Sequence, residues 1–83
     1  MARRPEVTLY KASGCHLCER ALQVVEEVRA EREFELRVVG IDGDPELEAR
    51  YREWLPVVEI DGRRAFVYHV QAADLRRRLA GSE

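Results

Sequence analysis

The sequence predicts a small α/β domain with a mixed sheet, and three observations carry this prediction. Short runs rich in β-branched and aromatic residues alternate with longer runs whose apolar residues recur every three or four positions. The chain has 83 residues, enough for one domain, expected over residues 1–83, with a compact core. The last two strand-like runs flank Asp61-Gly62, a pair that favours a tight hairpin. The expected order is β-α-β-α-β-β-α, a four-stranded mixed sheet flanked by three helices.

The first half of the chain predicts a parallel β-α-β unit. Residues 7–12 (VTLYKA) form the first expected strand, which Ser13-Gly14 interrupts. From Cys15 onward, apolar residues follow one helical stripe for several turns. Residues 34–41 (FELRVVGI) alternate between two faces and predict the second strand. A helix between two consecutive strands favours a right-handed parallel crossover.

The second half predicts a short helix, a hairpin and a final helix. Asp44 can cap a helix, and Pro45 suits its first position. A glycine just after a helical stripe is typical of a helix end, so Gly81 is expected to end the last helix. The expected elements are, in order, a helix at about residues 46–53, strands at 57–60 and 65–68, and a helix at 70–80.

Charge and hydropathy give no sign of a nucleic-acid or membrane partner. The formal charge is −2, and the two signs are interspersed along the chain. No stretch approaches the roughly 20 apolar residues that span a bilayer. The first residues, MARRPEVTLYKASG, lack the apolar region of a signal peptide. We therefore expect a cytoplasmic protein that binds neither nucleic acid nor membrane, and a monomer is the default for so small a domain.

The two cysteines lie where the first strand gives way to the first helix. Cys15 is expected at the helix start, where unpaired N–H groups and the helix dipole favour a thiolate. Cys18 lies one turn further along the same face, close enough to form a disulfide with Cys15. In a reducing compartment, such a pair is more often catalytic or metal-binding than structural. The pattern favours a redox pair in which Cys15 attacks a disulfide and Cys18 resolves the mixed disulfide.

His16 lies between the cysteines and allows two interpretations. As a cation beside Cys15 it would lower the pKa of that thiol and make the disulfide more oxidising. Alternatively, it only faces solvent. Leu17 is expected to pack or to line the edge of the site.

Metal binding is the main alternative to redox chemistry. Structural zinc takes four ligands, usually from two CxxC pairs, and this chain has one pair. His16 lies inside that pair, and His69 is expected at the surface after the last strand. No metal or other cofactor is therefore expected in a single chain, but zinc or an iron–sulfur cluster shared by two chains stays open. A third hypothesis is a binding module with inert cysteines.

A second signal, Trp54-Leu55-Pro56-Val57, precedes the third strand. Proline within a sheet is confined to edges and strand starts, and X–Pro bonds adopt the cis form most readily. A cis bond would turn the Leu55 backbone outward, where it could pair with an extended substrate strand. An ordinary trans proline is the simpler alternative. The CxxC motif is what favours a substrate-binding role for Leu55 and Pro56.

Three stretches, LYKASGCHLCERA, GIDGDPELEARY and LPVVEIDGRRAF, together resemble glutaredoxin-like proteins of the thioredoxin superfamily. The similarity spans about residues 6–80 and is nearest to small bacterial glutaredoxin-family proteins with a C-H-L-C motif. It implies a minimal thioredoxin fold and a thiol–disulfide oxidoreductase. Cys15 would be the nucleophile, Cys18 the resolving thiol and Pro56 the cis-proline. The partner would be a disulfide-containing protein, glutathione or another low-molecular-weight thiol.

The sequence departs from glutathione-binding glutaredoxins at three places. Those proteins usually carry C-P-Y-C, whereas the middle pair here is His16-Leu17. They usually have a lysine three residues before the first cysteine, where this chain has Ala12. After the hairpin they usually have a glycine pair, whereas residues 66–69 here read FVYH. A protein disulfide, or recycling by another dithiol system, is therefore at least as well supported as glutathione.

Overall fold

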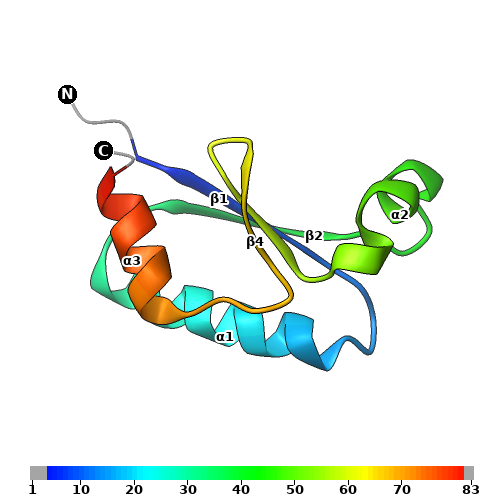
Figure 1. Cartoon of the computed structure of the whole chain (residues 1–83), viewed down its shortest axis with the longest axis horizontal. Coiled ribbons are helices and arrows are strands. Elements are labelled where there is room, and N and C mark those ends of the chain that lie inside the picture. Colours follow the sequence, from blue (N-terminus) through cyan, green and yellow to red (C-terminus); the bar gives the residue numbers. More distant parts are fainter. Residues whose placement is uncertain (1–3, 82–83) are drawn as a thin grey trace.

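The computed structural model describes residues 4–81, and its elements follow the order expected from the sequence (Figure 1). They are β1 (Glu6–Lys11), α1 (His16–Glu31), β2 (Glu35–Gly40), α2 (Pro45–Tyr51), the 3-10 helix η1 (Arg52–Trp54), β3 (Val57–Ile60), β4 (Arg63–Val67) and α3 (Ala72–Gly81). The predicted β-α-β-α-β-β-α order is confirmed.

The four strands form one mixed sheet in the order β2-β1-β3-β4. β1 pairs with β2 in parallel, and β3 runs antiparallel to both β1 and β4. The central strand β1 places Leu9 opposite Val38 on one side and opposite Val58 on the other. The helix α1 connects the two parallel strands, as the sequence predicted. This arrangement is the minimal thioredoxin fold.

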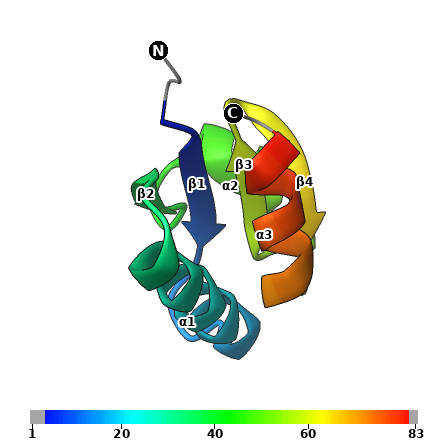
Figure 2. The same cartoon turned by 90° about the vertical axis from the view of Figure 1, so that its left-hand side faces the viewer.

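Helices cover both faces of the sheet (Figures 1 and 2). The larger core lies between the sheet and the helices α1 and α3, and its fully buried members include Leu9, Val25 and Leu75. A smaller core lies on the opposite face, where Tyr51 of α2 packs beside Val57. Successive strand residues point to opposite faces, so β3 contributes to both cores.

The hairpin turn has two residues, whereas the predicted strands at 57–60 and 65–68 left four residues between them. Asp61 and Gly62 both have positive φ, 51° and 81°, as a two-residue turn of the type favoured by strand twist requires. Pairing therefore resumes at once, and β4 begins at Arg63 instead of residue 65. β4 ends at Val67, because the next residue, Tyr68, has a left-handed φ of 67°.

Two helices also differ from expectation. The predicted helix over residues 46–53 is an α-helix that ends at Tyr51 and then tightens into η1. The α conformation is disfavoured immediately before proline, so a helix cannot run on to Pro56. The last helix begins at Ala72, not at residue 70, since Val70 packs into the larger core from the preceding loop. The helix α3 extends to Gly81, one residue beyond the predicted end at residue 80.

One cross-strand pair has a buried member and an exposed member, and substitutions of these two residues test the larger core. Leu9 is fully buried, whereas its partner Val38 on the edge strand is 42% exposed. We expect Leu9→Ala to lower the free energy of unfolding by about 2–5 kcal/mol. Val38→Ala should change it by no more than about 0.5 kcal/mol. Urea denaturation of both variants measures this, and equal effects would contradict the described core.

Candidate functional site

The candidate site forms at the end of the sheet where β1 stops and α1 begins, at the right of Figure 1. The Cys15 N–H donates to the carbonyl of Ala12 at 3.3 Å and closes a turn around Ser13 and Gly14. Gly14 has a φ of 73°, and the third residue of a type II turn needs such a positive value. This turn reverses the chain and delivers Cys15 to the start of the helix.

Cys15 is the N-cap of α1, so the helix proper begins at His16, one residue later than predicted. Its backbone is extended, and its carbonyl accepts the first helical hydrogen bond from Glu19 at 3.1 Å. Its sulfur takes the place of the usual capping oxygen, because the Cys18 N–H donates to Cys15 Sγ at 3.1 Å. The cysteine side chain therefore sits at the positive end of the helix dipole.

The structure joins Cys15 and Cys18 in a disulfide, and their Cα atoms are 5.2 Å apart. Cys18 is 1% exposed and belongs to the interior, whereas Cys15 is partly exposed. An incoming reagent therefore meets Cys15 first. The pair can accept two electrons and two protons by opening to two thiols, and this is the chemistry that the geometry allows.

The Leu55–Pro56 peptide bond is cis, as the sequence suggested it could be. Pro56 is fully buried, and Leu55 is partly buried against the smaller core. β3 begins at Val57, which pairs with Tyr10 of β1. The antiparallel register brings the segment before Val57 to the end of β1, the same end from which the Cys15 turn departs.

The two residues between the cysteines are both exposed. His16 lies in the first turn of α1, and Leu17 is 37% exposed beside it. Leu17 lines a hollow of about 270 Å³ between α1 and the connection from β4 to α3. The other lining residues are Arg20, Ala21, Val24, Tyr68, His69, Val70 and Gln71. Leu17 is therefore exposed beside the cysteine pair, and His69 lies at the surface as expected.

Sequence reasoning missed Tyr68, which it had assigned to a strand. Its N–H donates to the Pro56 carbonyl at 2.9 Å, and its hydroxyl donates to the Glu53 carbonyl at 3.1 Å. Its ring lies 6.2 Å from that of Trp54. A bulky residue with positive φ is rare, so no local pattern signals this conformation. Tyr68 links the Pro56 segment to the hollow beside Leu17.

Sequence reasoning also missed Asp42, which lies in the loop after β2. The Ser13 N–H donates to Asp42 Oδ2 at 2.8 Å, across 29 residues of sequence. This backbone hydrogen bond, together with those from the Ser13 side chain and Arg52, lowers the pKa of the Asp42 carboxyl. The carboxylate therefore touches the turn that carries Cys15.

Within residues 4–81, no three side chains of His, Cys, Asp or Glu gather closely enough to hold a metal ion. None of the helices in that same part of the chain has the length and apolar character needed to cross a bilayer.

This chain, with its arrangement of strands and cysteines, matches a known protein family. The family described as "Glutaredoxin-like domain (DUF836)" matches residues 6–80. The chain belongs to this family. An uncharacterized protein of Mycobacterium tuberculosis (strain H37Rv) is 33% identical over 84 residues, which cover 95% of this chain and 87% of the relative.

Solved structures agree with this glutaredoxin-like assignment. The crystal structure of a structural-genomics target protein from X. campestris has a TM-score of 0.77 and 30% sequence identity. It aligns with 93% of this chain and with 99% of its own. Fasciola hepatica thioredoxin has a TM-score of 0.65 and 25% identity, over 96% of this chain and 82% of the thioredoxin. The predicted resemblance to glutaredoxin-like proteins of the thioredoxin superfamily is confirmed.

A buried tyrosine supports this end of the glutaredoxin-like sheet. Tyr51 of α2 stacks on Tyr10, with ring centroids 4.1 Å apart, and its hydroxyl donates to Glu59 Oε2 at 3.0 Å. Burial raises the pKa of Tyr51, and its hydrogen bonds with Tyr10 and Glu59 raise it further. The phenol therefore stays neutral in the folded protein at a pH where an unfolded chain would already ionise it.

This raised pKa sets the expected response to alkaline pH. Stability from neutral Tyr51 is complete below about pH 10, the ordinary tyrosine pKa, and is lost as pH rises toward the folded value. Between pH 8 and about pH 11, the free energy of unfolding should therefore decrease less in Tyr51→Phe than in the wild type. Urea denaturation across this range measures it. An unchanged slope in Tyr51→Phe would contradict the prediction.

Proposed function

We propose that this glutaredoxin-like protein is a thiol–disulfide oxidoreductase that exchanges the Cys15–Cys18 dithiol with protein or small-molecule disulfides. The observation that carries the proposal is a CxxC pair at a helix start, with one sulfur partly exposed and the other buried. Family membership and the thioredoxin-like fold support it. A reducing compartment such as the cytoplasm would let a monomer of this kind turn over.

The proposed reaction proceeds in two exchanges. The Cys15 thiolate attacks one sulfur of the substrate disulfide, that S–S bond breaks, and the departing substrate thiolate takes up a proton. Cys18 then loses its proton and attacks the Cys15 sulfur, which releases the second substrate thiol and forms Cys15–Cys18. The substrate gains two electrons and two protons, and a low-molecular-weight thiol or another dithiol system restores the reduced pair.

The local geometry favours Cys15 as the attacking sulfur. The Cys18 N–H that meets Cys15 Sγ would also donate to a Cys15 thiolate, and hydrogen bonds to charged acceptors are stronger than those to neutral ones. The helix dipole acts in the same direction. The nearly complete burial of Cys18 suits a thiol that reacts only with its neighbour.

On the substrate side, we assign Leu55 and Pro56 to binding, together with the hollow beside Leu17. Bulky Tyr68 fills the place after the hairpin where glutathione-binding relatives usually have glycine. Buried Ala12 stands where those relatives usually have lysine. These two features favour a disulfide-containing protein over glutathione as the partner.

A redox titration read by mass after alkylation tests the proposed activity. We expect one reversible two-thiol transition between about −300 and −120 mV. Cys15→Ser should abolish disulfide exchange, whereas Cys18→Ser should accumulate a mixed disulfide with the substrate. The metal content of the same reduced sample is the control. The absence of a transition would overturn the proposal, and stoichiometric metal would then favour a shared metal or cluster site.

His16 gives a second test, because its two interpretations predict different potentials. If its cation stabilises the Cys15 thiolate, His16→Ala should make the reduction potential of the pair more negative. Leu17→Ala, which changes the neighbouring exposed residue without removing a charge, is the matched control. Equal potentials in the wild type and both variants would leave His16 as a solvent-facing residue only.

A further inference from the structure

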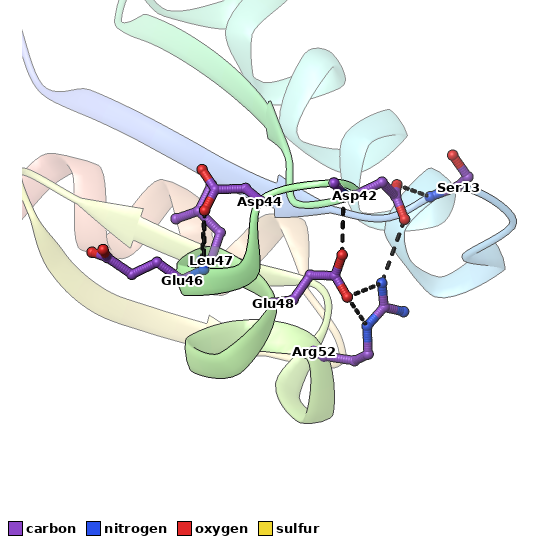
Figure 3. Close-up of polar contacts among 8 residues, drawn as sticks. Ser13, Asp42, Asp44, Glu46, Leu47, Glu48 and Arg52 are labelled. Atoms are coloured by element: carbon purple, nitrogen blue, oxygen red, sulfur yellow. Dashed lines mark hydrogen bonds and ion pairs between the residues drawn. The ribbon is translucent and has the colours of Figure 1, made fainter.

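The carboxylate of Asp42 lies between the two segments assigned to the site. Figure 3 shows it with Ser13 on one side and Arg52 on the other. Ser13 belongs to the turn before Cys15, whereas Arg52 opens η1, the short helix that leads into Pro56.

On the cysteine side, Asp42 contacts the backbone of the turn. The Ser13 N–H lies in the turn closed by Cys15 and Ala12, and it donates to Asp42 Oδ2 at 2.8 Å. Because this bond holds the peptide plane of the turn, it fixes the direction in which the chain leaves for Cys15. The neighbouring Ile41 N–H donates to the Lys11 carbonyl at 2.9 Å, which ties Asp42 itself to the end of β1.

On the proline side, the contact is an ion pair. Arg52 Nη2 lies 3.4 Å from Asp42 Oδ1 and 3.2 Å from Glu48 Oε1. Glu48 Oε2 in turn accepts the Gly43 N–H at 3.0 Å, which fixes the loop that carries Asp42. The guanidinium therefore bridges the loop after β2 and the start of η1 (Figure 3).

Stability alone accounts poorly for this arrangement. The side chains of Arg52 and Asp42 are 50% and 47% exposed, and exposed ion pairs contribute little to folding. The start of α2 is already capped by Asp44, whose Oδ1 accepts from the N–H groups of Glu46 and Leu47 at 3.1 Å.

We propose that Asp42 and Arg52 are positioning residues, which hold the Cys15 turn and the Pro56 segment in one fixed relative placement. The inference rests on the proposed exchange function. A substrate chain that contacts the Pro56 segment then presents its disulfide to Cys15 at a reproducible angle. Neither residue touches the reacting sulfurs, so both act through the segments that they join.

Two disulfide probes distinguish positioning from thiol reactivity. Insulin requires contact with a protein chain, whereas 4,4′-dithiodipyridine requires only an accessible thiolate. Misplaced groups slow a reaction steeply, so we expect Asp42→Ala to lower insulin reduction on the order of tenfold, and reaction with the small disulfide much less. Asp42→Asn should lie between the wild type and Asp42→Ala, because its amide oxygen still accepts the Ser13 N–H.

Asp44→Ala is the matched control, since it removes a carboxylate two residues away that caps α2 but contacts neither segment. We expect it to lower stability while insulin reduction per folded molecule stays near the wild-type value. Combining Asp42→Ala with Arg52→Gln should add little beyond the first change, because both disrupt one bridge. Equal loss in Asp42→Ala and Asp44→Ala, or equal loss with both probes, would overturn the inference.

Amide hydrogen exchange separates this inference from the proposed function. We expect Asp42→Ala to speed exchange at Ser13 and Cys15, and Asp44→Ala to leave both unchanged. If wild-type thiols react with the small disulfide but do not reduce insulin, the proposed protein substrate is wrong, and amide exchange alone then decides the placement. Unchanged exchange at both amides in Asp42→Ala would refute the proposed positioning role.

Discussion

The turn between β1 and α1 is the constraint on which the site depends. Gly14 adopts a positive φ, and the Cys15 N–H closes the turn onto Ala12. These two conditions make Cys15 the cap of the helix and not a residue within it. Its sulfur therefore meets the backbone N–H of Cys18, and the helix dipole, the hydrogen bond and the second thiol act on one atom.

The sheet supplies the rigidity that such a turn needs. β1 and β3 occupy the centre, where both faces carry buried side chains, and their pairing fixes Val57 opposite Tyr10. The turn and the Pro56 segment are the extensions of these two strands at one end. Binding and reactive groups commonly lie on loops held by a rigid scaffold, and this chain places its candidate groups in that way.

The face around the cysteines combines apolar surface with a few fixed polar contacts. Leu17, Trp54 and Tyr68 are the large exposed apolar side chains near it, and Tyr68 is held by bonds to two backbone carbonyls. Tyr68 keeps a strained backbone conformation, which persists where surrounding contacts impose it. A fold alone does not define an activity, so these residues and the sulfur geometry carry the functional argument.

The sequence by itself determined the features that short-range forces control. Strand and helix order, the Asp61-Gly62 turn and the placement of both cysteines at a helix start follow from local sterics and spacing. Tertiary structure alone decided the contact of Asp42 with Ser13 and the left-handed conformation of Tyr68. The physical reason is that each of these depends on a partner brought near by sheet pairing and core packing, which no local pattern encodes.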